Sequence, residues 1–246
     1  MSRKMNMKSA IAAIDRAGIL LVFPIANRKE PASLWSHFFP RKKMRWEWDE
    51  SGDDGVADLW HLKTEISTTR QVVYTKWFQG RATYFSKPLF QAALRALNPK
   101  GDLPATLSAE ARRILAVLET DSPVSTKALK QLTGLRGREN EKRYNRALKE
   151  LWSRLLIVAF GEVDDGAFPS LAVGSTRVLF ENLWEGAFKL TPAKAETEVR
   201  STLTGDSPFF RHFNKLMNAH TPKIAIRSRK PISMPRQLKV IHYKDL

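Results

Sequence analysis

The chain has 246 residues, 43% of them hydrophobic, with seven tryptophans and no cysteine. Such a composition can fill one to three packed cores, so it excludes a wholly disordered chain. Without cysteine there is no disulfide, thiolate metal site or cysteine nucleophile. The formal net charge of +16 favours a polyanionic partner such as DNA or RNA, although a basic surface also aids solubility.

The N-terminal stretch 1–18 is basic and then apolar. Asp15 and Arg16 interrupt its apolar run, which predicts a short helix and not a signal peptide. No apolar run in the chain reaches the ~18 residues of a membrane span. We therefore expect a cytoplasmic protein that does not contact a membrane.

Charge alternates in blocks along the chain. Residues 1–45 contain ten basic and two acidic residues, 46–70 contain two and seven, and 206–246 contain nine and two. This alternation indicates a basic face or basic tails beside an acidic loop. The acidic loop "DESGDDG" (49–55) departs from a calcium-binding EF-hand at Asp54 and Trp60, where glycine and an acidic residue are needed. The five histidines do not form a zinc-binding HExxH motif either, so we expect neither a metal site nor a cofactor.

Aromatic and basic residues are interleaved in "RWEWDE" (45–50) and "YTKWFQGRATYF" (74–85). This pattern can stack exposed nucleic-acid bases, but it is also typical of a small domain's core, which is the interpretation we favour. Ala82–Phe85 is expected to be a strand. Ser86 should begin a helix whose buried face is formed by Leu89, Ala93 and Leu97.

Three helices are predicted in the middle of the chain. Ser108 should cap the first, and its apolar face is formed by Ala111, Ile114, Leu115 and Leu118. Ser125 should cap the second, and Gly134 should end it in the left-handed conformation. The third follows in "GLRGRENEKRYNRALKELW" (134–152), with an apolar stripe of Tyr144, Ala147, Leu148, Leu151 and Leu155.

A β-hairpin is predicted after these helices, with strands in "LLIVAFGEV" (155–163) and "AFPSLAV" (167–173) and a turn at Asp165–Gly166. Three helices followed by a hairpin are the element order of a winged helix, whose third helix can enter the major groove of DNA. The candidate DNA-binding residues are the polar and basic side chains around this third helix: Arg136, Arg138, Lys142, Asn145, Arg146 and Lys149.

Two other interpretations of this helix remain open. Its basic face can be merely solvated, with Glu139, Glu141 and Glu150 nearby to compensate the charge. A winged helix can also serve as a protein-interaction module.

Composition divides the chain into four segments. We expect a winged-helix-like unit over 1–104, a winged helix over 105–175, a third, partial winged helix over 176–220 and a basic tail over 221–246. In the third segment we expect a helical core of Val178, Leu179, Leu183, Trp184 and Phe188. The tail is either an extended arm on nucleic acid, contacting it through Arg227, Arg229 and Lys230, or simply a tail.

Several stretches taken together resemble the AlkZ-related proteins. They are "AIDRAGILLVFPI", "SLW" at 33–35, "GRATYFS" at 80–86 and "LSAEARRIL…TGLRGRENEKRYNRALKELW", and the resemblance covers roughly residues 9–200. These proteins are relatives of the AlkZ/YcaQ-type DNA glycosylases, which are built from tandem winged-helix domains. The resemblance therefore implies a mainly α fold with small β-hairpins (α+β), tandem winged helices and association with DNA.

The resemblance does not extend to catalysis. The glycosylases position a water molecule with a Gln-apolar-Gln or Gln-apolar-Asp motif, whereas the corresponding "AGILLVFPI" (17–25) has no Gln, Asp or Glu. We therefore expect no catalytic residue and a non-catalytic DNA-binding protein linked to DNA repair or regulation. The alternatives are a DNA glycosylase with an altered active site and a protein–protein adaptor.

Overall fold

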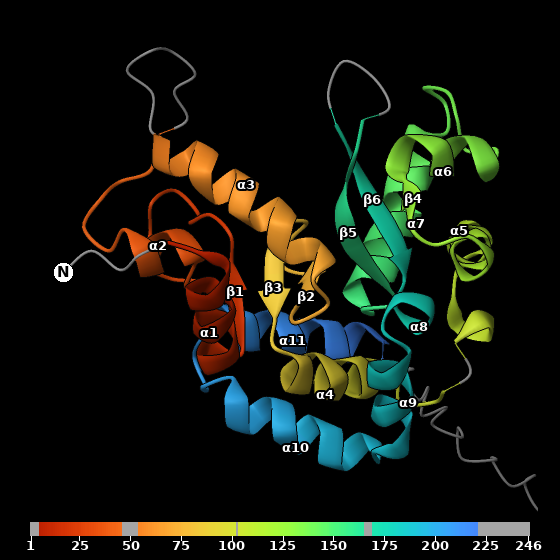
Figure 1. Cartoon of the computed structure of the whole chain (residues 1–246). Helices are drawn as coiled ribbons and strands as arrows, with labels where there is room; N and C mark the ends of the chain where they lie inside the picture. The colour runs from red at the N-terminus through yellow and green to blue at the C-terminus, as the bar shows by residue number, and fades with distance from the viewer. Residues whose placement is uncertain (1–4, 46–53, 102, 165–168, 221–246) are drawn as a thin grey trace, which may run out of the picture.

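The computed structural model describes residues 5–45, 54–101, 103–164 and 169–220. Helices surround a six-stranded antiparallel sheet with the strand order β1-β3-β2-β5-β6-β4 (Figure 1). The predicted α+β class is therefore confirmed. Within the described residues, no helix is long and apolar enough to cross a bilayer.

The first part of the chain places three short strands among helices. Asn6 caps the first helix by accepting a hydrogen bond from the Ser9 amide at 2.9 Å. The third helix already includes Asp54 and Gly55, so the end of the predicted acidic loop is helical, while 49–53 lie outside the described residues. The elements are α1 (Met7–Ala17), β1 (Ile19–Leu21), α2 (Leu34–Phe38), α3 (Asp54–Thr68), β2 (Val73–Thr75), β3 (Thr83–Phe85) and α4 (Lys87–Leu97).

The middle of the chain confirms the predicted local signals. Ser108 and Ser125 each cap a helix by accepting a backbone N–H bond, and Gly134 has a φ of +63°. The hairpin strands are confirmed, whereas the Asp165–Gly166 turn lies outside the described residues. The elements are η1 (Pro104–Thr106), α5 (Ala109–Thr120), β4 (Val124–Ser125), α6 (Thr126–Leu132), α7 (Glu141–Ser153), β5 (Ile157–Val163) and β6 (Ser170–Ser175).

The last described part of the chain is helical and packs back on the first. Helices α9 (Glu181–Lys189), α10 (Pro192–Thr202) and α11 (Pro208–His220) all contact α4 (Figure 1). The prediction that Val178 is buried was wrong, since 42% of its surface is exposed. Helix α8 (Thr176–Leu179) ends at Phe180, where φ is −134°, so the helical spacing that linked Val178 to the later apolar residues is broken.

One continuous hydrophobic core connects these parts. Strands β2 and β5 pair at Tyr74 and Ala159, so the sheet continues from the first part of the chain into the middle part. The core role predicted for the aromatic stretch 74–85 is confirmed, because its rings are at most 4% exposed: Tyr74, Trp77, Phe78, Tyr84 and Phe85. Most of the other stretch, 45–50, lies outside the described residues.

Candidate nucleic-acid interface

Helix α7 is held with one face against the core. Tyr144, Ala147 and Leu151 are buried, and the Tyr144 hydroxyl donates a 2.9 Å hydrogen bond to the Thr126 carbonyl. Leu148 is half-buried. Because this apolar stripe fixes the rotation of the helix, the basic side chains on the remaining arc point away from the core.

Of the three acidic residues around α7, Glu139 is exposed in the turn beside Arg138, whereas Glu141 and Glu150 are engaged with other partners. Glu141 accepts hydrogen bonds from Lys130 at 2.7 Å and from Asn145 at 3.1 Å, and the bond from Lys130 is the main cause that lowers the pKa of this carboxyl group. Glu150 accepts from the hydroxyl and the amide of Ser108, at 2.6 and 3.1 Å. These carboxylates hold helices together and do not neutralise the outer face of α7.

The outer face of α7 consequently carries uncompensated positive charge. Lys142, Arg146 and Lys149 are exposed, and within the described residues no carboxylate lies within 4.0 Å ion-pairing distance of them. Arg136 and Arg138 are exposed in the turn before the helix. Together these five residues form what we call the α7 basic face.

The other polar residues near α7 have different roles. Arg143 pairs with Glu110 at 2.5 Å, so its charge is compensated. Asn145 was predicted to bind DNA; one N–H of its amide is bonded to Glu141, which leaves the second N–H and the carbonyl oxygen for another partner. The predicted tail contacts Arg227, Arg229 and Lys230 lie outside the described residues.

A cavity of about 820 Å³ adjoins the α7 basic face. It lies between the β2–β3 turn (76–80), the α7 side chains from Asn145 to Ser153, and α11, with Thr126 and Leu171 completing its wall. Among the residues that the structure describes, no carboxylate lines it. Four cations do, and we call them the cavity cations: Lys76, Lys149, Arg211 and Lys215.

His212 forms part of the cavity wall and is half-buried. Its ring packs edge-on against Trp77 and Phe78, with centroids 4.7 and 5.0 Å away, and its Nε2 is 3.1 Å from the Trp77 carbonyl oxygen. Burial lowers the pKa of His212, the hydrogen bond to Trp77 opposes this, and the charges of Lys215 and Lys149 lower it further.

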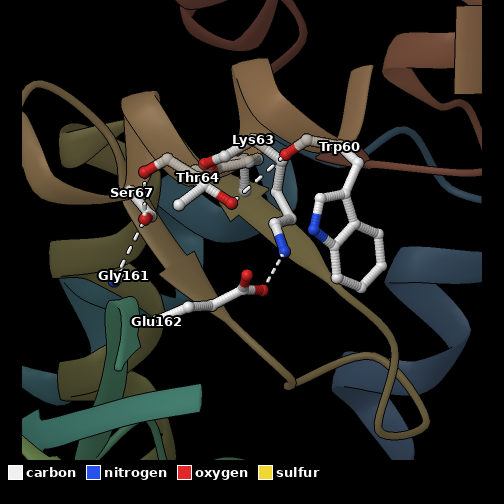
Figure 2. A network of polar contacts seen from close by, with 7 residues as sticks. Trp60, Lys63, Thr64, Ser67, Gly161 and Glu162 are labelled. Carbon is white, nitrogen blue, oxygen red and sulfur yellow. Dashed lines mark hydrogen bonds and ion pairs between the residues drawn. The ribbon is translucent and has the colours of Figure 1, made fainter. Parts of the chain in front are cut away.

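Lys76 connects this cavity to a buried ion pair between α3 and β5. Lys63 Nζ lies 2.5 Å from Glu162 Oε1 and 3.7 Å from the centre of the Trp60 ring (Figure 2). Burial lowers the pKa of Lys63, while Glu162 opposes that shift. Burial also lowers the pKa of Lys76. The charge of Lys63 lowers it further, and the charge of Glu162 opposes this shift.

A β-bulge in β5 directs the Glu162 side chain toward Lys63. The β5–β6 register shifts between Ala159 and Glu162, and Gly161 within the shift has a φ of +79°. The Gly161 amide donates a 3.0 Å hydrogen bond to the Ser67 hydroxyl of α3 (Figure 2). Bulges commonly redirect a side chain in this way, and here the result is a polar contact between α3 and the hairpin.

Sequence reasoning missed most of the cavity. The signal that it could have used is the spacing of Arg211 and Lys215, which are four residues apart and share one face of a helix. In the sequence, Lys76 stands out only as a cation among aromatic residues. Within the described residues, no cluster of three or more histidines or carboxylates could hold a metal ion.

The stretch "AGILLVFPI" (17–25) lies in and beside β1, and its Gly18 lines a second hollow together with Asp15, Arg16 and Gln71. The side chains of Ile19, Leu20, Leu21 and Val22 are at most 4% exposed. The amides of Leu21 and Val22 donate to the carbonyls of Ala32 and Ala82. This stretch therefore serves the sheet and the core.

Comparison with known proteins identifies the family. A family model described as "AlkZ related" matches residues 5–208, which is more than half of the chain. The chain therefore belongs to the AlkZ-related family. Searches of curated proteins and of solved structures returned no significant match.

Proposed function

We propose that this member of the AlkZ-related family binds duplex DNA through the α7 basic face without catalysing a reaction on it. The observation that carries the proposal is the exposure of Lys142, Arg146 and Lys149 with no carboxylate in reach among the described residues. Cations left unpaired on a rigid helix can displace counterions from DNA phosphates with little loss of conformational entropy. Membership of a family related to DNA glycosylases supports the same partner.

We further propose that the segment 105–175 is a winged helix and that 1–104 and 176–220 provide related units, with a basic tail over 221–246. Support comes from the element order of the middle segment, in which α5, α6 and α7 precede the β5–β6 hairpin and β4 pairs with β6. In this arrangement α7 takes the place of the recognition helix, which lies in the major groove.

The test is the salt dependence of duplex binding by the full chain. Each phosphate contact contributes about one unit to the slope of log affinity against log salt concentration. The triple variant Lys142→Gln, Arg146→Gln and Lys149→Gln should lose up to about three units of slope and bind more weakly at every salt concentration. Glutamine is a good helix former, so the variant should melt like the parent.

A matched control removes three exposed cations from other helices: Lys8→Gln and Arg16→Gln on α1, and Lys194→Gln on α10. This variant has the same net charge as the α7 variant and should keep the parent slope. Equal losses in the two variants would mean that net charge alone drives binding. A folded α7 variant that binds like the parent would show that the α7 basic face is only solvated.

A DNA glycosylase with an altered site is the second candidate, and the family membership is what favours it. A hydrolytic site needs a polar group that orients water or stabilises the developing sugar cation. The apolar stretch 17–25, in which Ile19, Leu20, Leu21 and Val22 are buried, provides none, which supports binding without catalysis. Release of a damaged base by the parent, abolished by a point mutation in this chain, would decide for the glycosylase.

A further inference from the structure

The cavity cations converge on one space instead of lying along a face. Lys76 comes from the turn after β2, Lys149 from α7, and Arg211 and Lys215 from α11. Without a carboxylate among the described lining residues, their positive charges add, which favours a bound anion. A volume of about 820 Å³ falls in the range of small-ligand pockets and is too confined for a double helix.

The walls of the cavity are largely aromatic and apolar. Trp77, Phe78 and Trp152 line it and are at most 7% exposed, and Leu148 and Leu216 add aliphatic surface. Contacts of Trp77 with Phe85 and of Phe78 with Phe209, at centroid distances of 5.3 and 5.0 Å, hold two of these rings in place. Because so little of each ring is accessible, these rings do not present a free face for stacking. Together with Leu148 and Leu216 they form a rigid apolar wall that a nucleobase can contact and that an inorganic anion would not need.

Neutral hydrogen-bonding groups lie between the cations and the rings. Gln79, Asn145 and Ser153 line the cavity with amide and hydroxyl groups that can both donate and accept. The buried indole N–H of Trp77 has no acceptor within the described residues. Cations, aromatic walls and neutral polar groups together match the phosphate, the base and the base edges of a nucleotide.

We propose that this cavity binds one unpaired nucleotide, with the phosphate at the cavity cations and the base against the aromatic wall. The inference rests on the proposed function in one respect, namely that DNA supplies the nucleotide. A nucleotide that leaves the stack beside α7 enters the cavity across Lys149, which belongs both to the α7 basic face and to the cavity.

The first experiment titrates the full chain with deoxyadenosine 5′-monophosphate, deoxyadenosine and inorganic phosphate in a calorimeter. The monophosphate should bind more tightly than either of the others, and Arg211→Gln with Lys215→Gln should weaken it. Phosphate that binds as tightly as the monophosphate would make the cavity a site for inorganic anions only and overturn the proposal. Binding that the double variant leaves unchanged would place the nucleotide elsewhere and also overturn it.

The second experiment compares a fully paired duplex with one that carries a single unpaired nucleotide. The parent should prefer the second by about fivefold, the effect of burying roughly 40 Å² of apolar base surface against the cavity wall. Arg211→Gln with Lys215→Gln should abolish this preference. The matched control, Lys142→Gln with Arg146→Gln, removes the same charge from the α7 basic face and should weaken both duplexes while keeping their ratio.

The outcomes separate this proposal from the proposed function. Tight binding of the paired duplex without any preference for the unpaired nucleotide would overturn the cavity proposal alone. Cavity-dependent binding of the free monophosphate without any duplex binding would overturn the proposed function and leave the cavity as a nucleotide site. Both double variants must melt like the parent, since the four substituted side chains are exposed.

Discussion

Replacing Glu162 with glutamine should destabilise the protein strongly, because it leaves the ammonium group of Lys63 buried without its counter-charge. Lys63 is 3% exposed and Glu162 is 16% exposed, so water screens their ion pair weakly. Breaking a buried pair by removing one partner costs about 3–5 kcal/mol. The Trp60 ring, 3.7 Å from Nζ, can offset only about 0.5–2 kcal/mol of that cost.

The chemistry of lysine sets an upper limit to the loss. The variant can deprotonate Lys63 in the folded state, which at pH 7 costs about 4–5 kcal/mol relative to a free lysine of pKa ~10.4. The pKa of Lys63 would then be depressed in the folded state, so stability is lost as pH falls and regained as pH rises toward the unfolded value. The difference in unfolding free energy between parent and variant should therefore shrink above pH 7 by up to about 1.4 kcal/mol per pH unit.

Urea unfolding followed by circular dichroism, at several pH values between 7 and 9.5, measures this effect. Glu196→Gln breaks the exposed pair with Arg200 on α10 and is the matched control, with an expected loss of about 0.3–0.5 kcal/mol. Adding Lys63→Met to the Glu162 variant removes the orphan charge and should restore most of the stability. A Glu162 variant that is as stable as the control, and whose stability does not depend on pH, would refute the conclusion that this ion pair stabilises the contact between α3 and β5.

Three further predictions concern other parts of the molecule. Burial lowers the pKa of His212 in the folded protein, so folding stability should be lost as the pH falls below ~6.5, the ordinary pKa of histidine. Thermal melts of His212→Gln over the same pH range should show a smaller loss of stability than melts of the parent. Gly161→Ala should cost about 1–2 kcal/mol in urea unfolding, because φ is +79° and the new Cβ would lie 3.1 Å from Thr68, whereas Gly205→Ala, with open space, should cost far less. The protein should release no base from alkylated or crosslinked duplexes; abasic sites that accumulate under single-turnover conditions, and that a point mutation abolishes, would contradict this.

Local signals in the sequence were sufficient for the elements of the middle segment. Ser108 and Ser125 cap helices, and Gly134 adopts a positive φ, because each depends on atoms within about one helical turn. The apolar stripe of α7 was predictable for the same reason, and it correctly placed Lys142, Arg146 and Lys149 on the outside. Secondary structure and the α7 basic face could therefore be predicted from the sequence.

The cavity could not be predicted, because it is built from segments far apart in the chain. Lys76, Lys149 and Lys215 come together only when α7 and α11 both pack beside the β2–β3 turn. Periodicity within one helix contains no information about which other helix it meets. The buried pair of Lys63 with Glu162 has the same origin, since 99 residues separate its partners and a bulge at Gly161 sets its direction.

The position of the cavity in the fold also bears on how this chain is related to the DNA glycosylases. A single polar substitution in β1 would place an amide or carboxylate among side chains that are at most 4% exposed, where a group without a partner costs about 1–3 kcal/mol and cannot reach solvent water. The cavity lined by the cavity cations lies instead between the β2–β3 turn, α7 and α11, while a smaller hollow borders Gly18 at the start of β1. The absence of a glycosylase motif in 17–25 is therefore not an isolated change of side chain. The surrounding core is built for an apolar strand, and the polar groups that could meet a nucleotide are at the cavity.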